Sequence, residues 1–384
     1  MLSTINMGGV TVTPDQLKTM HRGDYILHAR DGKLTEIAVE KTQLPLDPAV
    51  DNHQQLGFQA APDGTLYATQ KTQVSKSIDG GKTWTHKYCK IGKNGFGGLQ
   101  GFGTAVNQEG RLLFIGEPWM TTWSTDDDGE TWYKAGEFDT SFEKQGYDGS
   151  CLRLPDGTLM IPIQSRDGFE APESCDTPED VANFWRYVIR GAMTLYYFRS
   201  KDGGKTFPYR STFGDWCHET NATLLPSGRM LAAIRYQRPQ IPEDPPDILE
   251  RTGAPPRCGM PYKHVFLADS DDNGLTWNNM RQLTTLFGQC HGFPTGLTNN
   301  RVVVCHDNRL PEEVKGGRAM VSHDDGKTFE DEVYYLCHGV NAGHARTVTL
   351  DGEEMLTMVG ANQKPIEPIP VGQTPFFIIR WRLV

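Results

Sequence analysis

The chain of 384 residues lacks an apolar run of the roughly 18 residues that a membrane-spanning helix needs, so we expect no membrane-embedded segment. It also lacks an excess of basic residues, because 38 Lys and Arg face 48 Asp and Glu and leave a net charge of −10. We therefore expect no nucleic-acid partner, while a local cationic pocket is compatible with this balance.

The first residues lack a basic stretch followed by an apolar one, so no secretory signal is visible. A cytoplasmic protein is therefore expected, or a secreted or periplasmic one if a signal has been removed. Cysteine is sparse and scattered, since the eight copies form no C-x-x-C pair and no regular ladder. We expect reduced thiols, no cofactor and no metal.

Histidine directly follows four of the cysteines, Cys217, Cys290, Cys305 and Cys337. Adjacent residues on a strand point to opposite faces of a sheet, so such a dipeptide rarely gives two ligands to one metal. Small thiols packed in the core are the simpler interpretation. A zinc site that joins Cys217, Cys290 and Cys337 from successive repeats is the alternative.

The chain is rich in internal repetition. The pattern S-x-D-x-G-x-T-[W/F], once with Thr in place of Ser, occurs five times. The copies begin at Ser77, Thr125, Ser200, Ser270 and Ser322. The Asp and Ser side chains of such a pattern cap backbone N–H groups, the Gly supplies a positive φ, and the aromatic ring packs between neighbouring units. The pattern therefore predicts a structural hairpin turn rather than a catalytic group.

A second turn signal, P-D-G or a variant between apolar residues, precedes each copy and occurs a sixth time near the C-terminus. Its turn residues are Gly64, Gly110, Gly157, Gly228, Asn300 and Gly352. Six hairpins of short strands predict an all-β fold, a single six-bladed β-propeller domain over residues 1–384. We expect residues 25–34 to add a strand to the last blade, which closes the ring and hides both sheet edges.

Two repeats carry insertions. In the third, Thr177 can cap a helix and Pro178 suits its first turn, so we expect a short helix over about 178–190. In the fourth, residues 238–262 contain seven prolines and predict a stiff surface loop. Insertions of this kind often shape a binding mouth.

One position recurs around the predicted ring. The residue nine places before each turn residue should begin the innermost strand, at the mouth of the central funnel. This slot holds Gln55, Gly101, Asp148, Glu219 and His291, and also His344 if one residue of the sixth turn is deleted. Two carboxylates and two histidines that converge on one axis predict a polar site with acid–base chemistry.

The five turns on a six-repeat β chain resemble the sialidase (neuraminidase) superfamily, also called BNR or Asp-box proteins, over about residues 50–384. The segment from Cys217 to Arg235 is similar to a motif of bacterial sialidases, because Glu219 stands nine residues before Gly228 and Arg235 seven after it. The resemblance implies that Glu219 activates a tyrosine nucleophile. It also implies that Arg235 is one of three arginines that hold the carboxylate of the sugar.

Other parts of the sialidase pattern are absent. No [F/Y]-R-I-P motif supplies the first arginine, and residues 341–346, where the resemblance places the tyrosine, contain none. Arg318 and Arg309 are the candidates for the third arginine. Asp148, next to Tyr147, is the candidate for the acid–base aspartate. These departures indicate a scaffold whose chemistry has changed.

The first functional hypothesis is a glycoside hydrolase of the sialidase type that cleaves a terminal acidic sugar from a glycan. Arg235 and a second arginine, Arg309 or Arg318, would hold the carboxylate bidentately. Glu219 would act as a base or assist a nucleophile, and Asp148 would donate a proton. Gln55, in the same slot of the first blade, would also bind the substrate.

Two alternatives stay open. A polysaccharide lyase acting on a uronate would use a base among His218, His291, His344 and Tyr236, with an arginine that neutralises the uronate carboxylate. A non-catalytic carbohydrate-binding propeller would need no acid–base groups, so the polar ring argues mildly against it. The expected partner is a carbohydrate, anionic in the first two cases, and the sequence indicates no oligomeric state.

Overall fold

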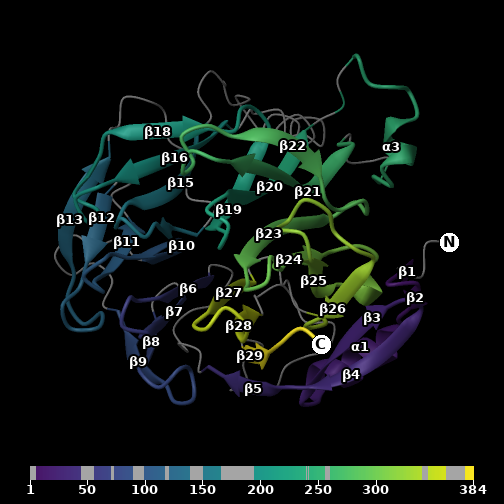
Figure 1. Cartoon of the computed structure of the whole chain (residues 1–384), viewed down its shortest axis with the longest axis horizontal. Helices are drawn as coiled ribbons and strands as arrows, with labels where there is room; N and C mark the ends of the chain where they lie inside the picture. The colour runs from purple at the N-terminus through teal and green to yellow at the C-terminus, as the bar shows by residue number, and fades with distance from the viewer. Residues whose placement is uncertain are drawn as a thin grey trace, which may run out of the picture.

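The computed structural model describes residues 6–44, 56–70, 73–89, 99–116, 121–138, 150–165, 194–238, 240, 242–255, 260–339, 345–359 and 377–384. Within these ranges the strands form six sheets that surround a common axis, with one small hairpin outside them (Figure 1). In each sheet the first strand of the repeat lies innermost and its successors follow outward. The expected all-β, six-bladed propeller is therefore confirmed.

The first three blades follow the chain order. Blade 1 contains β6 (Leu56–Ala60), β7 (Leu66–Gln70), β8 (Gln73–Ser77) and β9 (Thr85–Tyr88). Blade 2 contains β10 (Leu99–Val106), β11 (Leu112–Gly116), β12 (Thr121–Ser124) and β13 (Tyr133–Phe138), with β17 (Thr206–Phe207) parallel to β13. Blade 3 contains β14 (Leu152–Arg153), β15 (Leu159–Ser165), β16 (Thr194–Ser200) and β18 (Tyr209–Thr212).

Of the last three blades, the fifth and the sixth include strands from the beginning of the chain. Blade 4 contains β19 (Cys217–Leu224), β20 (Met230–Arg238), β21 (Tyr262–Ser270) and β22 (Asn278–Gln282). Blade 5 contains β23 (Gln289–Gly296), β24 (Val302–Asn308), β25 (Gly316–Ser322) and β26 (Glu332–Tyr335), extended by β3 (Tyr25–Arg30) and β4 (Lys33–Ala38). Blade 6 contains β27 (Arg346–Thr349), β28 (Met355–Val359), β29 (Phe377–Trp381) and β5 (Glu40–Gln43).

The expectation that residues 25–34 extend the last blade is wrong. The β3–β4 hairpin pairs with β26 and widens blade 5, whereas β5 pairs with β29 and supplies the outer strand of blade 6. Leu27 and Ala29 explain the choice, because they pack against Val333 and Tyr335 of β26 and against the helix α1 (Pro14–Arg22). This apolar match joins segments about three hundred residues apart, so no local pattern reveals it.

The turn between β21 and β22 represents the five repeated turns, which we call the Asp turns. Ser270 Oγ donates to Asp272 Oδ1 at 2.7 Å and accepts from the Gly274 N–H at 2.8 Å. Thr276 donates to Asp272 through its N–H and through Oγ1, the latter at 2.6 Å. The same hydroxyl-to-carboxylate bond measures 2.6 Å in all five turns.

Carbonyl groups of the Asp turns also accept hydrogen bonds from the preceding blade. Thr122 Oγ1 donates to the Gly204 carbonyl at 2.8 Å, and Arg281 Nη2 donates to the Gly326 carbonyl at 2.6 Å. Between these contacts, apolar side chains of adjacent blades form continuous cores, and Tyr67 and Val74 of blade 1 share one such core with Phe114 of blade 2. The ring is therefore held by both polar and apolar contacts between blades.

The insertion of blade 4 is anchored by an ion pair rather than by regular structure. Asp244 accepts two hydrogen bonds from Arg238, at 2.6 and 2.7 Å, and the short helix α3 (Ile248–Arg251) follows it. The helix expected over 178–190 lies outside the described residues. The remaining elements are β1 (Asn6–Met7), β2 (Val10–Thr11) and the 3-10 helix η3 (Glu312–Val314). Among the described helices, none has the length and apolarity needed to cross a membrane.

Candidate active site

The neighbouring inner strands β19 and β23 lose their regular pairing where they begin, next to the central axis (Figure 1), as β10 of blade 2 also does. The register of β19 with β20 shifts between Cys217 and Thr220, and that of β23 with β24 shifts between Cys290 and Phe293. His291 has φ 55°, a backbone conformation that is uncommon for a residue with a side chain. Such bulges re-aim side chains and are frequent beside active sites.

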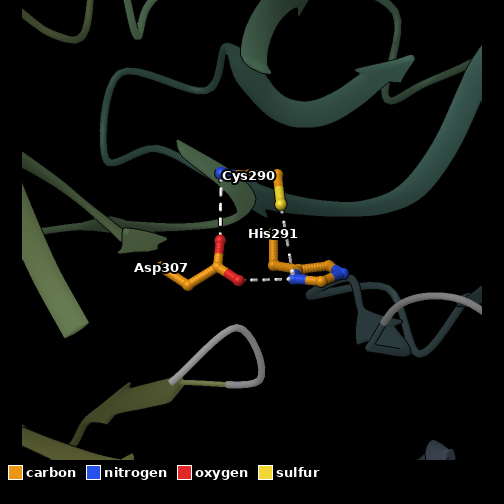
Figure 2. A group of neighbouring side chains, drawn as sticks. All are labelled: Cys290, His291 and Asp307. Atoms are coloured by element: carbon orange, nitrogen blue, oxygen red, sulfur yellow. Dashed lines mark hydrogen bonds and ion pairs between the residues drawn. The ribbon is translucent and has the colours of Figure 1, made fainter. Parts of the chain in front are cut away.

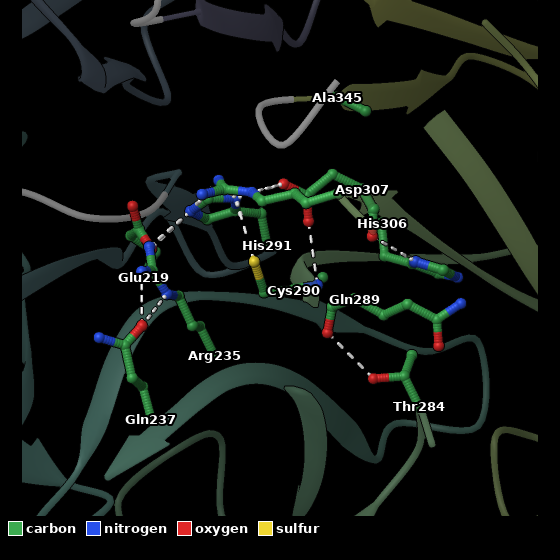
Figure 3. Close-up of polar contacts among 12 residues, drawn as sticks. Glu219, Arg235, Gln237, Thr284, Gln289, Cys290, His291, His306, Asp307 and Ala345 are labelled. Atoms are coloured by element: carbon green, nitrogen blue, oxygen red, sulfur yellow. Dashed lines mark hydrogen bonds and ion pairs between the residues drawn. The ribbon is translucent and has the colours of Figure 1, made fainter. Parts of the chain in front are cut away.

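The bulges bring Glu219 of β19 and His291 of β23 together across the boundary of blades 4 and 5 (Figure 3). Glu219 Oε2 lies 2.5 Å from His291 Nε2. On the other side of the imidazole, Asp307 Oδ2 of β24 lies 3.1 Å from His291 Nδ1. The second oxygen of Asp307 accepts from the Cys290 N–H at 2.9 Å. The imidazole is therefore held between two carboxylates from different blades.

Two arginines flank this imidazole. The Nη1 atom of Arg235 contacts Glu219 Oε2 and lies 2.8 Å from His291 Nε2, while its Nε and Nη2 donate to Gln237 Oε1. Arg309 donates from Nε to Asp307 Oδ2 at 2.5 Å, and its Nη2 lies 2.8 Å from His291 Nδ1. We call these five side chains, Glu219, Arg235, His291, Asp307 and Arg309, the polar cluster.

The polar cluster is open on one side. The side chains of Asp307 and His291 are 1% and 2% exposed, whereas those of Glu219 and Arg235 are 14% exposed and that of Arg309 is 27% exposed. A substrate therefore meets Glu219 and the two arginines first. Asp307 and His291 lie deeper, where His291 contacts Glu219 and Asp307 contacts Arg309.

The charges of the polar cluster stabilise one another. Burial alone would lower the pKa of His291, but the negative charges of Glu219, Cys290 and Asp307 outweigh it and raise the pKa to about 10. Burial would raise the pKa of Asp307, yet Arg309 and His291 hold it well below its usual range. His291 is consequently a cation at neutral pH, and Asp307 an anion.

The bulge of β23 also brings the side chains of Cys290, His291 and Asp307 close to one another (Figure 2). Cys290 Sγ lies 3.8 Å from His291 Nδ1, so the two neighbours do not point to opposite faces as a regular strand would have them. These three groups are of the kind that binds zinc. The guanidinium of Arg309, however, lies against both His291 and Asp307 and puts a positive charge where an ion would sit.

Four of the predicted site residues meet in the polar cluster: Glu219, His291, Arg235 and Arg309. Arg318 lies apart, because its side chain is 0% exposed and donates to the backbone carbonyls of Val314 and Gly317. It cannot reach a substrate from there, so its assignment as a substrate-binding arginine is not supported.

Tyr236 and His218 also lie outside the polar cluster. Tyr236 faces the other side of β20 from Arg235, where its ring lies 4.7 Å from that of Phe266. His218 precedes Glu219 in the bulge and is 3% exposed. The remaining predicted site residues, Gln55, Asp148 and His344, lie outside the described residues.

Sequence reasoning missed Asp307 and Gln237. Each stands two positions from a predicted arginine, Asp307 before Arg309 and Gln237 after Arg235. Alternate residues of a strand share a face, so this spacing carries a signal that both residues face the same site. Cys290, directly before His291, was assigned to the core, and its thiol is indeed fully buried.

Comparison with solved structures shows which known folds the chain is similar to. An α-L-arabinofuranosidase from Fusarium graminearum superposes with a TM-score of 0.59 at 16% identity, over 90% of this chain and 98% of that one. A Hadza microbial sialidase gives 0.55 at 13% identity, over 91% of this chain and 70% of that one. A Dyadobacter fermentans protein of unknown function gives 0.57 at 14% identity, over 90% and 98% of the two chains. The fold is a sialidase-like propeller.

No family model matches the sequence, and no curated protein matches it. The structural neighbours include glycoside hydrolases of two substrate types, at identities of 13–16%. At such identities the likeness describes the fold, and the reaction has to be argued from the polar cluster.

Proposed function

We propose that the chain is a glycoside hydrolase that removes a terminal acidic sugar from a glycan. The observation that carries the proposal is the contact of Glu219 with His291 between two partly exposed arginines, Arg235 and Arg309. The arginines, His291, Glu219 and Asp307 together carry three positive and two negative charges. This excess of one positive charge favours an anionic ligand.

The proposed chemistry gives each residue a separate task. Glu219 takes a proton from the attacking water or from a nucleophilic side chain, as a general base. His291 and Arg235 orient its carboxylate, and Asp307 fixes the imidazole through Nδ1. Arg235 and Arg309 bind the sugar carboxylate by charge-assisted hydrogen bonds. Asp148 stays our candidate for the proton donor to the leaving group.

A uronate lyase needs an unprotonated base to remove a proton from carbon. Because Glu219, Cys290 and Asp307 raise the pKa of His291 to about 10, this imidazole already carries its proton at neutral pH. Tyr236 faces the boundary with blade 3 rather than the polar cluster. Of the bases considered for an elimination, His291 is therefore protonated and Tyr236 lies apart from the polar cluster.

The test is turnover of fluorogenic methylumbelliferyl glycosides of N-acetylneuraminic acid, glucuronic acid and arabinofuranose. We expect the wild type to cleave an acidic glycoside, and Glu219→Gln to reduce kcat/KM about a thousandfold. Arg235→Met should reduce it for the acidic substrate as well. Glu243→Gln, an exposed carboxylate in the blade 4 insertion, is the matched control and should keep full activity.

Each other outcome corrects a defined part of the proposal. Turnover of the arabinofuranoside alone would keep the hydrolase and remove the acidic sugar. An unsaturated, ultraviolet-absorbing product from a uronate polymer would replace hydrolysis by elimination. Unchanged turnover in Glu219→Gln would remove Glu219 from the chemistry. Binding of sugars without turnover of any substrate would leave a carbohydrate-binding propeller.

A further inference from the structure

Lys263 lies beside the polar cluster, although no sequence pattern indicated it. It stands directly opposite Gln237 in the pairing of β20 with β21. Side chains of directly opposed residues lie on one face of a sheet, with Cβ atoms about 5 Å apart. Gln237 accepts two hydrogen bonds from Arg235, so Lys263 shares the face that carries Arg235. Its side chain is half-buried.

Lys263 differs from the two arginines of this face because it has no ion-pair partner among the described residues. Arg235 contacts the carboxylate of Glu219, and Arg309 is paired with Asp307. Among the described residues, no carboxylate lies within ion-pair distance of the Lys263 amine, and no side chain or carbonyl accepts a hydrogen bond from it. Among the described positive groups of this face, Lys263 is therefore the one without a carboxylate at ion-pair distance.

An uncompensated, half-buried ammonium is costly unless a ligand pairs with it. With Lys263 the face carries four positive groups against the two carboxylates of Glu219 and Asp307. A neutral sugar would leave this excess unbalanced, whereas an acidic sugar would reduce it.

We propose that Lys263 is the specificity-determining residue that selects an anionic sugar, by pairing with the carboxylate that Arg235 and Arg309 orient. The inference rests on the proposed function and deepens it. The two arginines supply geometry, since their charges are already balanced by Glu219 and Asp307. His291 leaves the polar cluster one net positive charge, and Lys263 raises this to two, so Lys263 strengthens the attraction that separates an acidic ligand from a neutral one of the same shape.

This selection has a pH dependence. Burial and the nearby charge of Arg235 lower the pKa of Lys263 to about 8, while Cys290 and Asp307 act in the opposite direction and Arg309 acts with Arg235. The amine is charged below that pKa and neutral above it. Affinity for an acidic sugar should therefore fall as the pH rises through about 8, although the arginines stay charged.

The experiment measures binding by calorimetry, so that it does not depend on turnover. The probes are N-acetylneuraminic acid and glucuronic acid, with their uncharged methyl esters as neutral counterparts. We expect Lys263→Met to weaken binding of an acid about tenfold or more and to leave the ester unchanged. Lys263→Arg should keep the affinity and lose the fall near pH 8. Lys33→Met, an exposed lysine of β4, is the control.

The outcomes separate this inference from the proposed function. Equal losses for acid and ester in Lys263→Met, or no loss for either, would overturn it, even in an enzyme that cleaves acidic glycosides. A wild type that prefers the esters, or binds neither form, would overturn it too. Selective loss of acid binding in Lys263→Met would support it, even if no glycoside were cleaved.

Discussion

Blade 4 has two ends that use hydrogen bonds differently. At one end, the Asp turn between β21 and β22 satisfies its polar groups within a few residues, as Asp272 does with Ser270 and Thr276. At the other end, the bulge of β19 turns Glu219 away from its own strand and toward His291 of the next blade. The Asp272 carboxylate is satisfied by residues of its own turn, whereas the Glu219 carboxylate depends on a residue of the neighbouring blade.

The difference separates stability from function. The Asp turns combine short local bonds with carbonyls that accept from the preceding blade, so they lock the ring in place. The bulged ends lack regular strand pairing, and His291 has a positive φ, a strained backbone conformation. Strain of this kind persists only where surrounding structure supports it, and it clusters at functional sites.

The largest expected effect comes from a methyl group placed under the bulge. A Cβ on Gly292 would lie 2.7 Å from the side chains of Ala233 and Val265 in blade 4, so Gly292→Ala should push β23 away from its neighbour. We expect about 2 kcal/mol lower free energy of unfolding and about a hundredfold lower kcat, because His291 moves with the strand. Denaturant unfolding and glycoside turnover measure the two effects.

The control for this prediction lies at the turn end of the same blade. Gly228 has φ 88°, and a Cβ there would meet nothing within 4 Å. Gly228→Ala should cost about 1 kcal/mol through backbone strain and leave kcat unchanged. If both alanines reduced activity equally, the two ends of the blade would not differ as argued.

An effect on stability alone should follow from opening an Asp turn. Asp272→Ala removes the acceptor of the Ser270 hydroxyl and of two groups of Thr276, and we expect a loss of about 2 kcal/mol in the free energy of unfolding. Activity of the folded protein should stay at the wild-type level. Parallel loss of kcat at a temperature where the variant is fully folded would contradict the separation of roles.

The last prediction concerns two buried histidines, whose contributions to the free energy of unfolding change with pH in opposite directions. Glu219 and Asp307 raise the pKa of His291 to about 10 against burial, so its stabilising contribution is complete below 6.5 and is lost as the pH rises toward 10. Burial lowers the pKa of His264 to about 4, so stability falls as the pH drops from 6.5 toward 4.

Urea unfolding across this pH range measures both contributions. His291→Asn should flatten the alkaline side of the stability profile, by on the order of 1 kcal/mol for each pH unit, and leave the acidic side unchanged. His264→Asn should do the reverse. An alkaline side that stays as steep in His291→Asn would show that other groups, Lys263 and Cys290 among them, cause the loss.

The fold was predictable because its signals are local. The hydrogen bonds that form each Asp turn join residues no more than four apart. A short sequence pattern is therefore enough to predict the turn. The pairing of β3 with β26 was not predictable, since it depends on an apolar match between residues far apart in the chain. Local patterns specify turns and strands, and partners are chosen later by packing.

The candidate site was predictable only in part. The slot that holds Glu219 and His291 follows from turn spacing, but the bulges that aim these residues at each other do not. A bulge depends on how one strand pairs with the next, and no residue type requires it here. Arg318 shows the same limit, because its sequence position does not reveal that its guanidinium lies in the core against Tyr335.

The pairing of β5 with β29 has a consequence for the order in which the protein is made. Residues 40–43 leave the ribosome more than three hundred residues before their partner strand, 377–381. During this interval the growing chain therefore carries an outer strand without a sheet to join, together with five blades that can already form. Closure waits for residues 377–381, and until then the open sheet edges need protection from other chains.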